Sequence, residues 1–343
     1  MAAPQSREPR PHASQAEVDA ARDDPKLANV LYHDWEAGSY DEKWSISYDE
    51  RCITFAVDRF RAAAGETGPF EHALELGCGT GFFLLNLMQG GIAKRGTVTD
   101  LSPGMVEVAL RNAEGLGLDL DGRVADAETI PMPDASVDLV VGHAVLHHIP
   151  DLDQAFREIL RVLRPGGRFV FAGEPTKIGD LYARKLGQAT WWATTTLTKL
   201  GPLSSWRRPQ DELDESSRAA ALEAVVDQHV FDPARLERFA LAAGAVDVRC
   251  VTEELTAALF GWPVRTFEAA VPPEKLGFPW AMFAYRTWQR LSWFDEHVAS
   301  RVVPRGLFYN ALVTGVRPEP PASISAPTSE KSRDGHWTSE NRR

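Results

Sequence analysis

The strongest constraint on the fold of this chain is the stretch 73–89 (ALELGCGTGFFLLNLMQ). A short apolar run, three closely spaced glycines and a second, helix-like apolar segment follow one another there. The apolar run is typical of a buried strand. Glycine lets the backbone turn sharply and lets a ligand approach main-chain N–H groups with no Cβ in the way. The stretch therefore predicts a strand that enters a helix through a ligand-binding turn.

Strand-like and helix-like segments alternate along much of the chain. Strands are expected at 73–76, 97–99, 122–125, 137–141, 168–172, 246–251 and 307–316, and helices at 51–64, 82–89, 103–113, 152–163 and 233–243. Ser102 and Asp232 are expected to cap two of these helices, because each precedes a proline in the first turn. Such alternation predicts an α/β fold, with a parallel sheet covered by helices on both faces.

Two aromatic-rich insertions interrupt the alternation. They span 175–230 and 253–305, and seven of the ten tryptophans lie between Trp191 and Trp293. We expect them to form a largely helical cap on a core made of 27–174, 231–252 and 306–317. The ends, 1–26 and 318–343, are rich in Pro, Ser and charge, so we expect them to be disordered.

Composition excludes several classes of protein. With 48 acidic and 37 basic residues the net charge is −11, which argues against a nucleic-acid partner. Cys52, Cys78 and Cys250 are too widely spaced for a disulfide framework or a metal site, and no metal ligand set is predicted. The polar N-terminal residues exclude a secretory signal, and no segment is suited to span a membrane. A cytoplasmic protein is expected.

Polar residues follow the predicted strands at the edge where ligands of open α/β sheets bind. Asp100 ends the second strand and can accept hydrogen bonds from both ribose hydroxyls of a nucleoside. Asp126 ends the third, where a carboxylate can accept a bond from an adenine amino group. The fourth ends in GHAVLHH at 142–148, and RPGG at 164–167 is expected to form a turn before the fifth.

The set ELGCGTG, TDLSPGM, ADAE, GHAVLHH and RPGG resembles the class I S-adenosylmethionine-dependent methyltransferases. The likeness is to the branch that includes the ubiquinone and menaquinone C-methyltransferases. It covers about 40–174 closely and 231–317 loosely. It implies a Rossmann-like, mostly parallel seven-stranded sheet and S-adenosylmethionine as the cofactor.

The resemblance also implies roles for individual residues. The methionine part of the cofactor would be held by Glu75 and by the turn Gly77, Cys78, Gly79 and Gly81; the ribose by Asp100; and the adenine by Leu101, Met105, Asp126 and Ala127. His143 stands near the methionyl group, where relatives often have Asn, Ser or Cys. Tyr40 resembles a tyrosine that closes over the cofactor.

Three residues are candidates for a general base, which a carbon or oxygen acceptor would require. They are His147, His148 and Glu174, each of which also has a structural interpretation as a helix-start residue or as a partner for a backbone donor. His33 and Asp34 could line the mouth of the cofactor site, or form a surface pair.

Two other classes of function remain as alternatives. A nicotinamide-dependent oxidoreductase would share the first strand, turn and helix, but Phe82 stands where a dinucleotide fingerprint has its third glycine. Tyr182 and Lys185 are one residue too close for the Tyr-x-x-x-Lys pair of such enzymes. A non-catalytic cofactor-binding or regulatory protein would keep the same cofactor residues.

The insertions are the best indication of the substrate. Their aromatic side chains predict an apolar pocket for a hydrophobic small molecule such as a quinone, polyketide, terpenoid or lipid. The same side chains could instead form the insertions' own core or a dimer interface. Residues 181–208 combine tryptophan with basic ends, which would suit peripheral contact with a membrane surface.

Overall fold

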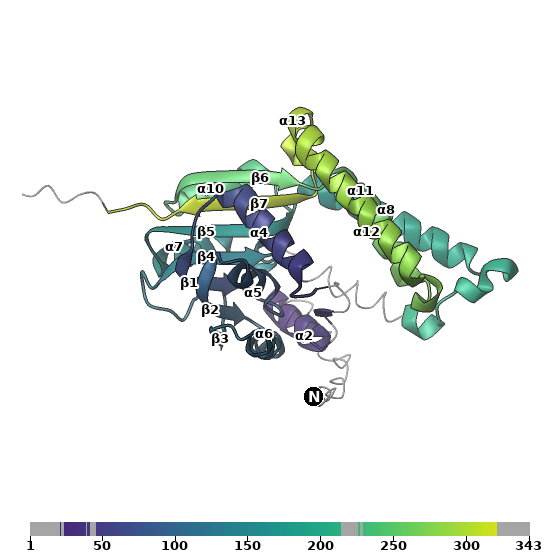
Figure 1. Ribbon diagram of the computed structural model, residues 1–343, viewed down its shortest axis with the longest axis horizontal. Helices are drawn as coiled ribbons and strands as arrows, with labels where there is room; N and C mark the ends of the chain where they lie inside the picture. The colour runs from purple at the N-terminus through teal and green to yellow at the C-terminus, as the bar shows by residue number, and fades with distance from the viewer. Residues whose placement is uncertain are drawn as a thin grey trace, which may run out of the picture.

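A computed structural model describes residues 21, 24–38, 40–41, 46–213, 226 and 229–320. Its centre is one seven-stranded sheet in the order β3-β2-β1-β4-β5-β7-β6 (Figure 1). The strands are β1 (Phe70–Leu76), β2 (Ala93–Asp100), β3 (Leu120–Val124), β4 (Val137–His143), β5 (Leu163–Pro175), β6 (Val246–Glu253) and β7 (Asn310–Val316). The predicted seven-stranded α/β sheet is confirmed.

All neighbouring strands from β3 to β5 run parallel, and β7 runs antiparallel to both β5 and β6. Parallel neighbours need crossovers, and these are the helices that separate the strands in sequence. The antiparallel β7 was not foreseen from its apolar pattern, because that pattern is the same in either direction. The sheet is therefore mostly parallel with one reversed strand.

Helices cover both faces of the sheet. One face packs against α4 (Glu50–Ala64), α5 (Phe82–Gln89) and α6 (Pro103–Leu116), and the other packs against α7 (Leu152–Val162) and α10 (Pro233–Ala242). Successive strand residues supply opposite faces: Leu74 and Leu76 join the core under α7 and α10, whereas Ala73 joins the core under α4 and α5. Burial on both faces explains why these strands read as continuous apolar runs.

Helix starts follow the predicted signals. Ser102 accepts the backbone N–H of Met105, and Asp232 accepts that of Ala234, each with a proline in the first turn. Both predicted caps are confirmed. A further helix, α2 (Pro25–Glu36), begins at Pro25 with Asp24 as its cap, so Pro25 and Lys26 are helical and the disorder expected up to residue 26 is wrong for them.

Two other expectations need correction. Residues 164–167, which were expected to form a turn, lie inside β5. Leu163 of β5 already pairs with Val137 of β4, and the register between the two strands shifts before the next pair, Arg168 with Leu139. The last strand starts at Asn310 because Arg305–Leu307 forms a short 3-10 helix. The rest of the expected disordered ends, residues 1–20, 22–23 and 321–343, lies outside the described residues.

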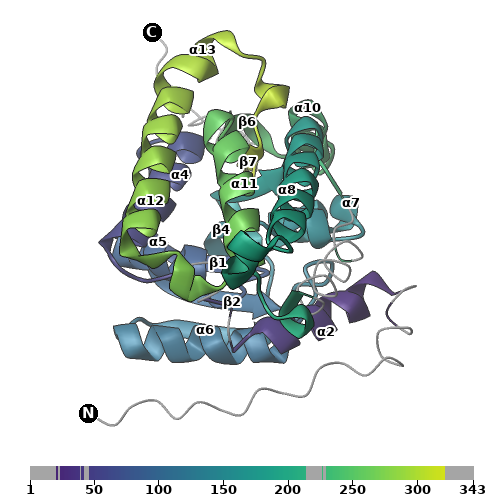
Figure 2. The same cartoon turned by 90° about the vertical axis from the view of Figure 1, so that its right-hand side faces the viewer.

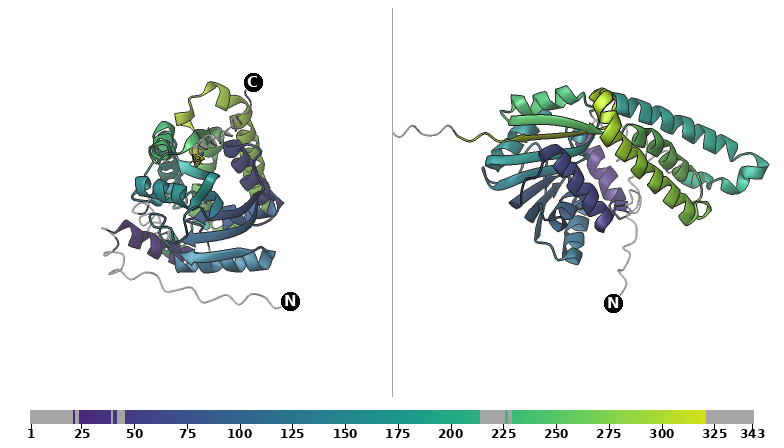
Figure 3. Two further views of the ribbon diagram at one scale, coloured as in Figure 1. Left: turned by 90° about the vertical axis from the view of Figure 1, so that its left-hand side faces the viewer. Right: turned by 45° about the horizontal axis from the view of Figure 1, so that its top comes forward.

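The helices of the two insertions extend away from the sheet (Figure 1), and Figure 2 views the protein from the side on which they project. They are α8 (Lys177–Leu197), η2 (Gly201–Trp206), α11 (Thr256–Ala270), η3 (Pro273–Lys275), α12 (Gly277–Phe294), the π-helical turn η4 (Asp295–Ala299), α13 (Ser300–Val302) and η5 (Arg305–Leu307). Helix α11 packs against both α8 and α12. We call residues 177–208 and 256–307 the helical arm; Figure 3 shows it from two further sides.

No helix in the described part of the chain is both long enough and apolar enough to cross a membrane.

Because the sheet core is packed and the arm is less buried, removing a phenyl ring from the core should lower the free energy of unfolding more than removing one from the arm. Phe169 on β5 is fully buried, so Phe169→Ala should lower the free energy of unfolding by about 3–5 kcal/mol. Phe278 on α12 is 76% exposed, and Phe278→Ala should change it by no more than about 0.5 kcal/mol. Urea unfolding followed by circular dichroism measures both values. Equal losses would show that the arm is as tightly packed as the sheet.

Candidate active site

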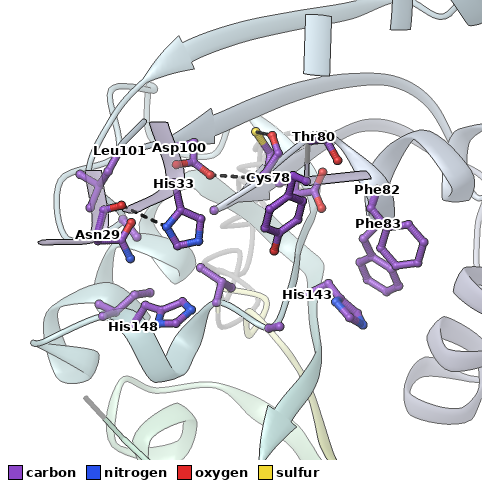
Figure 4. A pocket seen from close by; sticks show the side chains of 18 of the residues that line it. Asn29, His33, Cys78, Thr80, Phe82, Phe83, Asp100, Leu101, His143 and His148 are labelled. Carbon is purple, nitrogen blue, oxygen red and sulfur yellow. Dashed lines mark hydrogen bonds between the residues drawn. The ribbon is translucent and has the colours of Figure 1, made fainter. Parts of the chain in front are cut away.

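A pocket opens at the carboxyl ends of β1, β2 and β4, where the strand order reverses direction between β1 and β4 (Figure 4). Crossovers from neighbouring strands leave on opposite faces at such a point, and this opens a crevice in which α/β proteins bind ligands. Ten of the twelve residues that were predicted to bind a cofactor line the pocket: Tyr40, Glu75, Gly77, Cys78, Gly79, Asp100, Leu101, Asp126, Ala127 and His143.

The glycine turn forms one wall of the pocket. Gly77, Gly79 and Gly81 have φ of 57°, 50° and 88°, a region that other residues rarely adopt. A Cβ at Gly77 would lie 2.2 Å from Cγ2 of Val145, so the turn and the end of β4 approach each other closely. Gly81 does not line the pocket; a Cβ there would meet Leu85 and Ala109, so its glycine serves packing at the start of α5.

Asp100 holds the glycine turn in place. One carboxylate oxygen accepts the backbone N–H of Gly79 at 2.9 Å, and the other accepts that of Ser102 at 2.9 Å. Burial raises the pKa of Asp100, and the two hydrogen bonds and His33 oppose that rise. Glu75, also buried, accepts the N–H of Leu84, and burial raises the pKa of its carboxyl well above the ordinary value.

Helix α2 lies across the pocket and was not predicted. At its start, the ammonium of Lys26 contacts Asp126 and Glu128, each at 2.6 Å. Burial lowers the pKa of Lys26, but its hydrogen bonds to the two carboxylates outweigh this and raise it overall. Near the end of α2, Asp34 accepts the hydroxyl of Ser102 and the N–H of Gly104. The helix is thus fixed at both ends to loops that border the pocket.

Three pocket residues come from α2: Lys26, Asn29 and His33. Of these, His33 was considered for the mouth of the site, and the structure puts it in the lining, with its Nδ1 on the carbonyl of Asn29 (Figure 4). The sequence held a signal for this helix, since Asp24 followed by Pro25 is a helix start. Met105, predicted to flank the adenine, is buried in the first turn of α6 and does not line the pocket.

The buried carboxylate of Glu174 is occupied by the protein itself. Its two oxygens accept the backbone N–H groups of Val145 and Leu146, and both the N–H and the ring Nδ1 of His147, at 2.9–3.1 Å. Neither Glu174 nor His147 lines the pocket. These contacts are the ones expected from the structural interpretation of Glu174, because its carboxylate supplies acceptors for a loop whose N–H groups turn inward.

The remaining histidines occupy opposite sides of the pocket (Figure 4). His148 lies beside His33, with ring centroids 5.8 Å apart, and burial holds its pKa well below the ordinary value. His143 stands against Phe82 and Phe83, with centroids 5.4 and 5.6 Å away. Burial, then the positive charge of Arg59, lowers the pKa of His143 to about 4, so this imidazole is neutral near pH 7.

An aromatic series leads from His143 toward the arm. Phe55 on α4 lies 6.3 Å from His143 and 5.9 Å from Phe82, measured between ring centroids. Trp288 on α12 stacks on Phe55 at 6.4 Å with an interplanar angle of 26°. Phe55 thus connects the His143 side of the pocket to Trp288, which belongs to the second insertion.

Part of the chain is similar to known methyltransferases. Residues 74–171, from the glycine turn through β5, match a family model described as a methyltransferase domain. A malonyl-acyl-carrier-protein O-methyltransferase of Serratia marcescens is 34% identical over 168 residues, which cover 48% of this chain and 61% of the relative. The resemblance to the class I S-adenosylmethionine-dependent methyltransferases that the sequence motifs indicate is confirmed over these residues.

Other relatives of this chain carry varied names. Demethylmenaquinone methyltransferase of Thermus thermophilus is 35% identical over 125 residues, which cover 35% of this chain and 56% of that relative. The solved structure of phosphoethanolamine N-methyltransferase 2 of Haemonchus contortus shares the fold, with a TM-score of 0.52 at 16% identity, covering 86% of this chain and 59% of that one. The chain spans between about two fifths and three fifths of the curated relatives it matches first.

The structural role of Glu174 predicts how its variants behave. Glu174→Ala would leave three buried N–H groups without an acceptor and should lower the free energy of unfolding of the protein by at least about 3 kcal/mol. Glu174→Gln keeps one acceptor oxygen and should cost less. Thermal and urea unfolding measure both. A Glu174→Gln protein with unchanged stability and no turnover would instead support the general-base role.

The low pKa of His143 predicts a pH dependence of stability. The unfolded chain binds a proton at this residue near pH 6.5, whereas the folded chain does so near pH 4, so stability should fall as pH drops through that window. His143→Asn should remove this contribution, about 2 kcal/mol between pH 7 and pH 4.5. Urea unfolding of both proteins at the two pH values tests it. Parallel losses in the two proteins would contradict it.

Proposed function

We propose that this protein transfers a methyl group from S-adenosylmethionine to a small, hydrophobic acceptor. The observation that carries the proposal is the pocket at the reversal of strand order, lined by Glu75, Asp100 and Asp126 from the ends of successive strands. These carboxylates suit a ligand with a cationic amine, a ribose diol and an amino-bearing base, in that order along the pocket.

The residues present fit S-adenosylmethionine. The turn at Gly77 and Gly79 leaves room for close backbone approach, Asp100 can accept from ribose hydroxyls, and Asp126 and Ala127 border the far end. Asp126 is already bonded to Lys26 and to the N–H of Glu128, but a carboxylate offers about four acceptor positions. When bound, S-adenosylmethionine supplies an electrophilic methyl group on a sulfonium.

The chain's own contribution to transfer is alignment and exclusion of water. Holding two reactants in line can supply about 7–11 kcal/mol of the barrier reduction. Phe82 and Phe83 line the His143 side of the pocket, and Phe55 lies against both His143 and Phe82. The neutral ring of His143 can accept a hydrogen bond or a proton from a methyl-accepting substrate that is bound on this side of the pocket. We therefore add His143 to the candidate bases; of the three predicted from the sequence, His148 lines the pocket, whereas Glu174 and His147 do not.

The class of acceptor is inferred from the aromatic series. An acceptor next to His143 would meet Phe55 and, through it, Trp288, so it would lie against apolar rings. This wall supports a flat or extended hydrophobic molecule, in agreement with the cap role proposed for the insertions. The relatives' names include acceptors as different as malonyl-acyl-carrier protein, demethylmenaquinone and 27-O-demethylrifamycin SV, so they do not identify the acceptor of this chain.

Calorimetric titration with S-adenosylhomocysteine tests the cofactor site. We expect binding by the wild type, no binding of NADH, and an affinity at least tenfold lower in Asp100→Ala, because the glycine turn and the ribose both lose an acceptor. Asp153→Ala, an exposed position on α7, is the matched control and should bind normally. A melting curve checks that each variant is folded.

Catalysis is tested with S-adenosylmethionine carrying a radiolabelled methyl group, incubated with a hydrophobic extract and followed by mass identification of the product. Label in an apolar product that disappears with Asp100→Ala supports the proposal. Tight binding of S-adenosylhomocysteine with no transfer to any extract would favour the non-catalytic alternative. Binding of NADH in place of S-adenosylhomocysteine would overturn the assignment of the cofactor.

A further inference from the structure

The helical arm lacks an apolar core of its own. In α8 the buried residues are Gly179, Ala183 and Thr194, in α11 they are three alanines, and in α12 there are none. Helix α12 nevertheless has nine large apolar or aromatic side chains among its 18 residues (GFPWAMFAYRTWQRLSWF). Helices of that composition are normally buried on at least one face. The arm therefore has apolar surface that the other described residues of the chain do not cover.

The exposed apolar residues of the protein are concentrated on this arm. Within the described part of the chain, 18 large hydrophobic side chains are exposed, and 14 of them belong to the arm. Trp192 on α8 is 70% exposed, and Phe278 and Trp293 on α12 are 76% and 59% exposed. A concentration of exposed apolar side chains on one part of a molecule is typical of an interaction site.

The charge of the arm is opposite to that of the remaining chain. The arm holds twelve Lys and Arg against five Asp and Glu, a net charge of +7. Because the whole chain carries −11, the remaining residues carry −18. The basic residues are interleaved with the exposed aromatic ones. On α12, Phe283, Arg286, Arg290 and Trp293 follow at spacings of three and four, which places them on one side of the helix.

That side of α12 carries no carboxylate: Arg286 and Arg290 are the only charged residues of the helix. Together with Gln289 and Trp293 they line a shallow hollow on the surface. Helix α8 repeats the pattern, with Ile178, Leu181, Lys185 and Trp192 spaced so that they share an exposed side. Aromatic rings beside guanidinium and ammonium groups are the chemistry of helices that lie in the headgroup region of a bilayer.

We propose that the helical arm docks on the surface of an anionic lipid bilayer. Its aromatic side chains would enter the headgroup boundary, and its lysines and arginines would contact lipid phosphates. The acidic remainder of the chain would be repelled by the same surface, which orients the protein with the arm toward the lipid. A symmetric dimer through the arm is less favourable, because it would bring two surfaces of charge +7 together. This inference goes beyond the proposed methyl transfer and does not depend on it.

Co-sedimentation of the full chain with vesicles tests the proposal. We expect binding to vesicles of equal parts phosphatidylcholine and phosphatidylglycerol, weak binding to phosphatidylcholine alone, and loss of binding as salt rises to about 0.5 M, where charge is screened over a few ångströms. Intrinsic tryptophan fluorescence should shift to shorter wavelength on binding. An absence of binding to the anionic vesicles, or equal binding to both kinds, would overturn the proposal.

Two variants with the same change in net charge separate the arm from the rest of the surface. Arg286→Glu with Arg290→Glu should weaken binding to the anionic vesicles at least tenfold. The control, Lys94→Glu with Arg111→Glu, alters two exposed sites on the sheet domain and should leave binding unchanged. An equal loss in both variants would contradict a role for the arm.

A third variant tests the apolar contribution without changing charge. Trp192→Ser with Phe278→Ser should reduce binding to anionic vesicles several-fold, while titration with S-adenosylhomocysteine shows that the cofactor site is unaffected. Light scattering without lipid measures the oligomeric state. A dimer that Arg286→Glu with Arg290→Glu dissociates, together with no vesicle binding, would assign the arm to a second copy of the chain and overturn the proposal.

Discussion

The carboxylate of Asp100 joins the parts from which the pocket is built. One oxygen fixes the glycine turn after β1, and the other fixes the loop that leads from β2 into α6. Ser102 of that loop in turn donates to Asp34, which ties in helix α2. A single buried group thus sets the relative positions of two strand ends and one covering helix. A carboxylate accepts these bonds at two oxygens, which no apolar side chain could do.

The sequence predicts features that depend on residues close together in the chain better than features that depend on residues far apart in it. The glycine turn, the caps at Ser102 and Asp232 and the alternating core residues are local patterns, and the structure has them as expected. The antiparallel direction of β7 depends on its pairing with β5 and β6, which lie far away in the sequence. Apolar alternation does not encode that direction.

The candidate site shows the same division. Ten residues that were predicted to bind the cofactor line one pocket. Most of them lie at or just after the carboxyl ends of strands, and the parallel topology brings these ends to one edge of the sheet. The role of Glu174 was left open because it depends on where the N–H groups of 145–147 point, and Ala144 turns that loop with φ of 53°. Lys26 was assigned to a disordered end because its partner Asp126 lies 100 residues further along the chain.

Helix α2 has a consequence for how ligands enter and leave. It contributes Lys26, Asn29 and His33 to the pocket and is anchored by an ion pair at one end and by hydrogen bonds from Asp34 at the other. A molecule enclosed in the pocket is released fastest when both anchors are open together. Its residence time is therefore coupled to the ionic strength through one anchor and to the order of the loop after β2 through the other. The release of a bound molecule would then depend on the covering helix as well as on the contacts that bind the molecule.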